Sequence, residues 1–238
     1  MLKLSDQLRS KLELLRLKSR TRFYSFVRIK FRKYLENKDI AIVSSYCKEI
    51  TPLLNEINHF YTKIHPINIS VYERTSKNIL DDVSLTYGET SWKGMIEIIK
   101  YLEIKKKDIF YDLGCGSGKF VFLINLKFGI RSIGIDQIES FIKISNIVTK
   151  KLQLENICFF NDDFLTENIY DGSIFYITAT CFDEELMSKI IKKMKKIKTG
   201  AKVVVITQPL DCEHLELYKT MKCNFSWARD NVYFYKKI

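Results

Sequence analysis

One segment of the sequence constrains the fold more than any other: an apolar run ends in Asp112-Leu-Gly-Cys-Gly-Ser-Gly118, and a second apolar run starts at Lys119. Residues 109–113 are predicted to form a buried strand and residues 119–128 a helix. Glycines allow the backbone between them to turn sharply and to approach a ligand closely. The sequence therefore predicts a strand-turn-helix unit whose helix N-terminus presents free N–H groups to a carboxylate or phosphate.

Short β-branched runs and helical patterns alternate from Tyr87 to the end of the sequence. Strands are predicted at Ile109–Leu113, Ser132–Asp136, Ile157–Phe160, Ser173–Thr178 and Lys202–Thr207. Helices are predicted at Trp92–Leu102, Lys119–Phe128, Ile138–Leu152, Glu184–Lys196 and Cys212–Met221. The segments Asn224–Trp227 and Val232–Lys236 predict an antiparallel hairpin. This order predicts an α/β fold with a doubly wound, Rossmann-like parallel sheet and an antiparallel C-terminal edge.

A different pattern occupies the first 84 residues. Apolar residues recur at three- and four-residue steps between residues 4 and 34, which predicts a long amphipathic helix or a broken pair of helices. A second helical stretch is expected over residues 39–64, kinked or divided at Pro52, and residues 70–85 are expected to form an irregular connector. We therefore predict two parts: a helical basic segment with its connector (residues 1–84) and a sheet domain (residues 85–238).

The positive charge of the chain is concentrated near its start. Residues 1–40 contain 12 Lys and Arg against four Asp and Glu, which is eight of the eleven net positive charges. Such an asymmetry predicts an acidic partner, for example nucleic acid, an anionic membrane surface or an acidic protein. A solvated helix face is the alternative interpretation.

Targeting signals and metal ligands are not evident in the sequence. No apolar stretch approaches the roughly 18 residues that span a bilayer, and charged residues interrupt the leucines near the start, unlike a signal peptide. We therefore expect a cytoplasmic protein. The six cysteines form no CxxC pair and no ligand-like spacing with the three histidines, so buried, reduced thiols are expected rather than a metal site or disulfides.

The glycine turn also indicates the kind of ligand. Its spacing is GxGxG after an acid, whereas a dinucleotide-binding turn has GxGxxG. Asp112 would repel a pyrophosphate, but it can accept a hydrogen bond from the ammonium group of a methionyl moiety. The sequence therefore favours S-adenosylmethionine over NAD.

Acidic positions after the next two strands extend this site. Asp136 ends the second strand, where an acid on a doubly wound sheet reaches ribose hydroxyls; an ordinary surface acid is the alternative. After the third strand, Asp162-Asp163-Phe164 offers the adenine amino group an acceptor and its ring an apolar face, although acidic turns are common. Upstream, Tyr87-Gly-Glu-Thr90 precedes a helix start with Thr90 or Ser91 as the N-cap, and capping alone would explain this segment.

Five motifs together resemble a known family. Tyr87-Gly-Glu-Thr90 ahead of the glycine turn, Asp162-Asp-Phe164, Ser226-Trp227 and Val232-Tyr-Phe-Tyr235 resemble the disruptor-of-telomeric-silencing (Dot-one) methyltransferases over residues 85–238. Members of this family are class I protein-lysine N-methyltransferases without a SET domain, and their best-known substrate is a histone. The resemblance implies S-adenosylmethionine as the cofactor and a lysine in a protein substrate as the acceptor.

The resemblance also implies roles for individual residues. Tyr87 and Thr90 would lie over the methionyl end of the donor with Asp112 and Gly114 beneath it, and the ribose and the adenine would be held at the acidic positions named above. The predicted donor-binding residues are Tyr87, Glu89, Thr90, Asp112, Gly114, Gly116, Gly118, Lys119, Asp136, Asp163 and Phe164.

The sequence departs from the family pattern on the acceptor side. The family has an asparagine pair after the fourth strand, where this chain has Thr178-Ala179, and a channel tyrosine where this chain has Phe234. Thr178, Trp227 and Phe234 are therefore the candidates for the catalytic and channel positions. Phe182 and Tyr235 are further candidates for an aromatic channel, which would favour the uncharged form of a lysine; edge-strand core residues are the alternative.

Three functions remain open from the sequence. The first is methylation of a protein lysine. The second is methylation of RNA or of a small molecule on the same fold, with the basic start of the chain binding an acidic substrate. The fourth predicted strand lacks the Asn/Asp-Pro-Pro-aromatic motif of nucleobase-amine enzymes, which weakens part of the second. The third is a binding protein without turnover.

Overall fold

The computed structural model describes residues 36–238, so the predicted helix over residues 4–34 and most of the basic segment lie outside the described residues. The chain divides into two units, residues 1–42 and residues 43–238. Of the first unit, residues 36–42 are described and are helical. The second unit contains every other element discussed below.

In the second unit a seven-stranded sheet has the order β3-β2-β1-β4-β5-β7-β6. The strands are β1 (Ile109–Leu113), β2 (Arg131–Asp136), β3 (Ile157–Asn161), β4 (Ile174–Thr178), β5 (Lys202–Ile206), β6 (Leu215–Asn224) and β7 (Arg229–Lys237). The first five are parallel, β7 runs antiparallel to β5, and β6 pairs with β7 at the edge. The predicted doubly wound sheet with an antiparallel C-terminal edge is confirmed.

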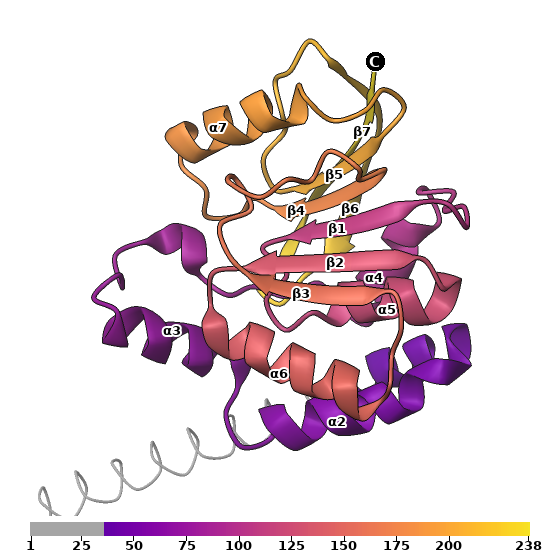
Figure 1. Ribbon diagram of the computed structural model, residues 1–238, viewed down its shortest axis with the longest axis vertical. Coiled ribbons are helices and arrows are strands. Elements are labelled where there is room, and N and C mark those ends of the chain that lie inside the picture. Colours follow the sequence, from indigo (N-terminus) through magenta and orange to yellow (C-terminus); the bar gives the residue numbers. More distant parts are fainter. Residues whose placement is uncertain (1–35) are drawn as a thin grey trace, which may run out of the picture. The chain divides into compact units, whose positions relative to one another are not determined.

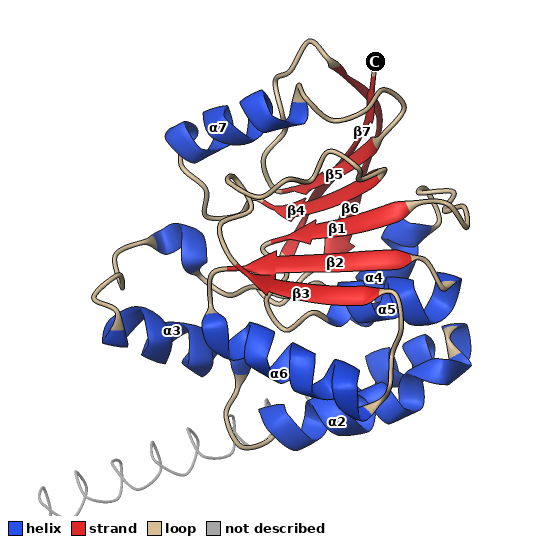
Figure 2. Ribbon diagram, in the orientation of Figure 1, coloured by secondary structure: helices blue, strands red, loops and turns tan. Residues whose placement is uncertain are grey.

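Helices cover both faces of the sheet (Figure 1). One face carries α4 (Trp92–Ile99), α5 (Lys119–Phe128) and α6 (Glu139–Lys151), and the other carries α7 (Glu184–Met194). Figure 2 shows this layering, with the sheet between the two sets of helices. Because β1, β4 and β5 are buried on both faces, they consist largely of apolar residues, which explains why the sequence identified them.

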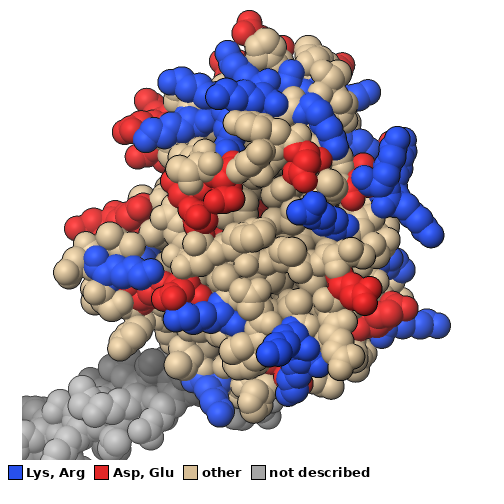
Figure 3. Space-filling view, viewed as in Figure 1, with Lys and Arg blue, Asp and Glu red and all other residues tan. Residues whose placement is uncertain are grey.

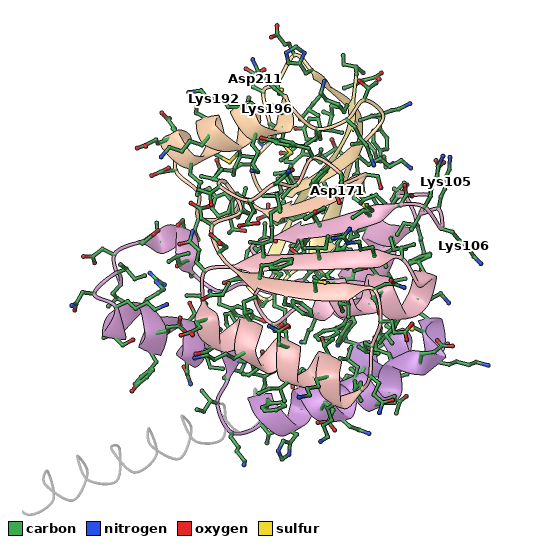
Figure 4. All side chains as sticks on the ribbon, viewed as in Figure 1. Lys105, Lys106, Asp171, Lys192, Lys196 and Asp211 are labelled. Atoms are coloured by element: carbon green, nitrogen blue, oxygen red, sulfur yellow. The ribbon has the colours of Figure 1, made fainter. Side chains whose placement is uncertain are left out.

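The chain reverses its winding direction at the centre of the sheet. Strand β1 pairs with β2 on one side and with β4 on the other. In open α/β sheets such a switch point opens a crevice outside the carboxyl ends of the strands. Lys105 and Lys106, which precede β1, project from the opposite end of the sheet (Figure 4).

A short 3-10 helix and one α-helix precede α3 (Pro66–Ser76). A 3-10 helix, η1 (Lys48–Ile50), is followed by α2 (Thr51–Tyr61). Pro52 stands in the first turn of α2, where a missing N–H costs nothing, so it divides the stretch predicted over residues 39–64 instead of kinking one helix. Helix α2 packs against α6.

The prediction of an irregular connector over residues 70–85 is wrong. This region contains most of α3 (Pro66–Ser76) and a 3-10 helix, η2 (Val83–Leu85). His65 caps α3 by accepting the N–H of Ile67. The buried face of α3 is polar, with Ser70, Glu73 and Arg74, so the apolar periodicity that identifies most helices is missing.

The helix predicted at Cys212–Met221 is also wrong, because residues 215–221 of this segment belong to β6. The composition of Leu215-Glu-Leu-Tyr-Lys-Thr-Met221 is compatible with a helix, but pairing with β7 along nine residue positions outweighs local preference. Strand β6 lies at the sheet edge and is mostly exposed, so its pattern lacks the apolar run of a central strand.

Two further properties concern only the described residues. None of their helices is long and apolar enough to cross a membrane. The six cysteines all lie in this part and are free thiols; four are buried, as predicted, whereas Cys158 and Cys181 are half-buried.

Candidate functional site

A cavity of about 260 Å³ opens at the carboxyl ends of β1, β2 and β4, where the winding direction reverses. Its walls come from the segment before α4, the glycine turn after β1, the segments that follow β2 and β3, and the region between β4 and α7. The lining residues are Asp82, Ser84, Leu85, Thr86, Tyr87, Gly88, Gly114, Gly116, Asp136, Gln137, Ile138, Phe141, Asp163, Phe164, Leu165, Thr178, Phe182, Leu186 and Lys189.

The glycine turn has the conformation that its sequence requires. Gly114, Gly116 and Gly118 have φ angles of 88°, 50° and 74°, a region that L-residues with a side chain rarely adopt. A Cβ on Gly114 would meet no atom within 4 Å, whereas a Cβ on Gly116 would lie 2.7 Å from the Tyr87 ring. The turn is therefore open to the cavity at Gly114 and closely covered at Gly116.

Asp112 lies directly behind this turn and is 4 % exposed. Burial, and then the charge of Asp136, raise its pKa well above the usual range. Within residues 36–238 no group donates a hydrogen bond to its carboxylate. A buried carboxylate without a partner is costly, so this position fits a ligand that brings a cationic donor.

Asp136 lines the cavity at the end of β2. Its carboxylate accepts the N–H of Gly116 at 2.7 Å and the N–H of Ile138 at 2.8 Å. Burial raises its pKa to about 6 although these two bonds act in the opposite direction. Each carboxylate oxygen has two acceptor sites, so Asp136 can hold the turn and still accept hydroxyl groups of a ligand.

The residues after β3 form one end of the cavity. Asp163 accepts the N–H of Leu165 at 2.8 Å, and Phe164 is buried beside it. The rings of Phe164 and Phe182 are nearly parallel, with centroids 6.4 Å apart. This end of the cavity thus combines a carboxylate with flat apolar surface, as the adenine prediction requires.

The segment Tyr87–Thr90 divides into residues that line the cavity and residues that support it. Tyr87 lines it and donates a hydrogen bond to Ser117 at 3.0 Å. Glu89 instead pairs with Lys119, and the Thr90 hydroxyl bonds to Tyr176 at 2.5 Å. Glu89, Thr90 and Lys119 are therefore close to the predicted donor site without lining it in this structure.

The helix cap that follows is Ser91. Its hydroxyl accepts the N–H of Gly94 at 3.0 Å and donates to the carbonyl of Asn224 at 3.0 Å. Capping therefore explains Ser91 and leaves Thr90 available for its contact with Tyr176.

The hairpin between β6 and β7 is joined to this same segment. Glu89 and Ser226 exchange two hydrogen bonds of 2.7 and 2.9 Å, although they are 137 residues apart. Trp227 packs over Gly88, where a Cβ would lie 2.5 Å from its ring. Two motifs that the sequence placed far apart thus meet beside the cavity.

The structure separates the remaining channel candidates. Thr178 and Phe182 line the cavity, whereas Phe234 is fully buried between the rings of Tyr101 and Tyr218, with centroid distances of 5.5 and 6.1 Å. Tyr235 points to the other face of the sheet and accepts the N–H of Leu210 at 2.8 Å. Neighbouring residues of a strand face opposite sides, and β7 lies inside the sheet. Phe234 and Tyr235 are therefore core residues here and do not line this cavity.

Residues after β5 were missed by the sequence analysis. Thr207 has φ of 72°, which is strained for a β-branched residue, and it donates to Asp230 at 2.6 Å. Asp230 also accepts the indole N–H of Trp227 at 3.1 Å, and Gln208 donates to the carbonyls of Ala179 and Phe182. No local pattern marks these residues, because their partners lie in other strands.

Comparison with solved structures identifies the fold. An RNA methyltransferase from Salinibacter ruber aligns with a TM-score of 0.51 at 17% identity, covering 60% of this chain and 89% of that one. Geranyl diphosphate C-methyltransferase from Streptomyces coelicolor aligns with a TM-score of 0.53 at 11% identity, covering 62% and 76%. At such identities the likeness concerns the fold alone, and it confirms the class I methyltransferase fold.

Comparison of sequences identifies the family. A "histone-lysine N-methyltransferase, H3 lysine-79 specific" from Dictyostelium discoideum is 32% identical over an alignment of 118 positions, which covers 43% of this chain and 6% of that much longer protein. The family model of the histone methylation protein DOT1 matches residues 69–216. The match thus begins upstream of residue 85, where the resemblance was expected to start, and it includes most of α3. The chain belongs to the DOT1 family of histone methylation proteins.

Proposed function

We propose that this chain binds S-adenosylmethionine in the cavity and transfers its methyl group to a lysine side chain of a protein. The observation that carries the proposal is the buried, unpartnered carboxylate of Asp112 behind a glycine turn that is open at Gly114. Membership of the DOT1 family supports the same chemistry.

The described residues provide a place for each part of the donor. Asp112 would accept the ammonium group, Asp136 the ribose hydroxyls, and Asp163 with Phe164 would hold the adenine. Tyr87 would cover the methionyl end from the opposite side of Gly116, against which its ring packs. Bound there, S-adenosylmethionine would supply an electrophilic methyl group, and the chain would exclude water and align the acceptor with it.

The mouth of the cavity favours a cationic acceptor. Between η2 and α7 the cavity continues into a hollow lined by Asp81, Asp82, Asp183 and Glu185, with Lys189 as the single basic residue among its lining. Acidic side chains flank this region at the left of the view in Figure 3. A negative surface attracts a basic peptide and repels a nucleic acid, which supports a protein lysine over RNA.

Apolar side chains in and beside the cavity favour the loss of the proton that a lysine must lose before methylation. Phe182 lines the cavity and Trp227 covers Gly88 beside it. An apolar surrounding disfavours the charged ammonium and so lowers the pKa of an entering lysine. These two residues, together with Thr178, are our candidates for contact with the acceptor.

A labelling experiment with the full chain tests the proposal. Purified protein is incubated with tritiated S-adenosylmethionine and either nucleosomes or a cell lysate, with and without nuclease, and labelled products are analysed by mass spectrometry. We expect methyl-lysine in a protein, and a histone is the first candidate because the Dictyostelium relative is H3-specific. Label confined to RNA or to a metabolite would instead show that the chain methylates RNA or a small molecule. The Asp112→Asn variant is the background control.

Two expectations about the rest of the chain remain predictions. The basic residues 1–40 are expected to bind an acidic partner, and removal of residues 1–36 should flatten the salt dependence of acceptor binding while donor affinity stays largely intact. A cytoplasmic location is the second expectation, and fractionation of cells that express the chain tests it.

A further inference from the structure

Helix α3 buries its polar face and exposes apolar side chains. Glu73 and Arg74 are 7 % and 6 % exposed, whereas Ile67, Val71 and Tyr72 of the same helix are exposed. A surface helix normally does the reverse, and burying charged groups is costly unless their partners are well placed. The contacts of these buried groups therefore indicate what α3 does.

Glu73 contacts the N-terminus of α6. Its two carboxylate oxygens accept the N–H groups of Glu139 and Ser140 at 2.8 and 3.0 Å, and Lys77 donates to it at 2.7 Å. Ile138 precedes α6 and has an apolar side chain that cannot accept these N–H groups, so Glu73 caps α6 from another helix. Burial would raise the pKa of Glu73, but these hydrogen bonds lower it to about 2.

Arg74 and Ser70 contact the segment that leads to Tyr87. The guanidinium of Arg74 donates to the Thr86 hydroxyl at 3.2 Å and also to the carbonyl of Leu80. Ser70 donates to the carbonyl of Leu85 at 2.9 Å. The backbone from residue 80 to residue 86 is thus attached to α3 at three points.

These two sets of contacts end on two segments that line the cavity together. Thr86 and Tyr87 belong to one segment, and Ile138 and Phe141 to the other. The rings of Tyr87 and Phe141 contact each other, with centroids 5.0 Å apart. Because one helix holds both segments, the shape of this part of the cavity depends on α3.

We propose that Glu73 and Arg74 are positioning residues of the donor site, which set the distance between the segment 82–88 and the start of α6. This inference rests on the proposed function, because the ligand of the cavity that these two segments line is the methyl donor. The DOT1 match starts at residue 69 and therefore includes all three polar residues of the buried face.

The test compares four variants of the full chain. Arg74→Met removes both contacts to the segment and the buried charge, Arg74→Lys retains one donor, and Glu73→Gln weakens the cap of α6. Lys151→Met is the matched control, because it breaks the ion pair of α6 with Glu56 on α2, outside the cavity lining. Calorimetry with S-adenosylhomocysteine measures donor-site affinity, and thermal unfolding measures stability.

We expect Arg74→Met to lower the affinity for S-adenosylhomocysteine at least tenfold, and Glu73→Gln to lower it severalfold. Arg74→Lys should restore part of this affinity, and Lys151→Met should leave it unchanged. Turnover at saturating donor should fall much less than donor affinity, which loss of folded protein would not produce. A second readout needs no ligand: in a Trp92→Phe background, Trp227 is the remaining tryptophan and packs on Gly88, so Arg74→Met should increase its quenching by acrylamide.

The outcomes separate the two proposals. Wild-type protein that fails to bind S-adenosylhomocysteine would refute the proposed function, and the quenching experiment would still test whether α3 holds the segment. Normal ligand affinity in folded Arg74→Met and Glu73→Gln would refute the positioning role. If Arg74→Met does not fold, the same comparison applies to Arg74→Lys and Glu73→Gln, and unchanged affinity and quenching in both would refute it.

Discussion

The two halves of the cavity are held in place in different ways. On the donor side, Gly114, Asp136 and Asp163 follow the ends of neighbouring parallel strands, and backbone N–H groups fix Asp136 within hydrogen-bond distance of the turn. On the acceptor side, Trp227 stands in the turn between β6 and β7, and hydrogen bonds between Glu89 and Ser226, 137 positions apart, join this turn to the segment before α4. The donor half therefore follows from strand order, whereas the acceptor half depends on long-range contacts.

The largest expected effect comes from adding a side chain to the glycine turn on the donor side of the cavity. Gly116→Val places a Cβ 2.7 Å from the Tyr87 ring at a positive φ, so we expect S-adenosylhomocysteine affinity to fall on the order of 100-fold. Gly129→Ala is the matched control: its φ is also positive but a Cβ there meets nothing within 4 Å. It should lose about 1 kcal/mol of stability and keep its affinity in calorimetry, and an equal loss in both variants would contradict the expectation.

Asp112→Asn should separate binding from stability. The change removes a buried carboxyl group whose charged form burial disfavours, so the melting temperature should stay the same or rise. Ligand affinity should fall roughly tenfold or more, because the ammonium group loses a charged acceptor. Calorimetry and thermal unfolding of the same preparation measure both quantities, and a lower melting temperature with normal affinity would show that Asp112 is structural.

A substitution on the acceptor side should reduce turnover more than donor affinity. Trp227→Ala removes the ring that covers Gly88, and we expect turnover to fall about tenfold through poorer alignment, with S-adenosylhomocysteine affinity changed less than threefold. Phe234→Ala should cost about 3–5 kcal/mol of stability, as a buried core truncation, without a selective effect on turnover. A selective effect of Phe234→Ala on turnover in folded protein would restore Phe234 to the channel.

The smallest effect is a pH dependence of donor binding. Burial raises the pKa of Asp136 to about 6, so its carboxylate is charged above this pH and protonated below it. The charged form is the better acceptor for hydroxyl groups, so affinity should be full above pH 7 and fall about fourfold by pH 5.5. Calorimetry with wild type and Asp136→Asn isolates this contribution from that of Asp112; identical profiles would assign the dependence to another group.

The sequence was sufficient to predict the elements whose structure depends on neighbouring residues. The bounds of β1 and α5 match their predicted ranges, because a buried apolar run, a glycine turn and a second apolar run carry their own signals. Helix α3 was missed because Glu73 and Arg74 occupy its buried face, and their partners lie in other elements. Phe234 was placed in a channel by family pattern, but a pattern does not state which face of β7 a residue occupies.

The ties between residues 89–91 and 224–226 have a consequence for how the protein is made. On a ribosome, Tyr87 and its neighbours are synthesised long before the hairpin that holds them, and contacts of such high sequence separation form slowly. The glycine turn and its helix can fold early, since their contacts are local. In the nascent chain the glycine turn therefore forms before the segment that covers it is held in place, and the cavity is completed only when Ser226 and Trp227 have left the exit tunnel.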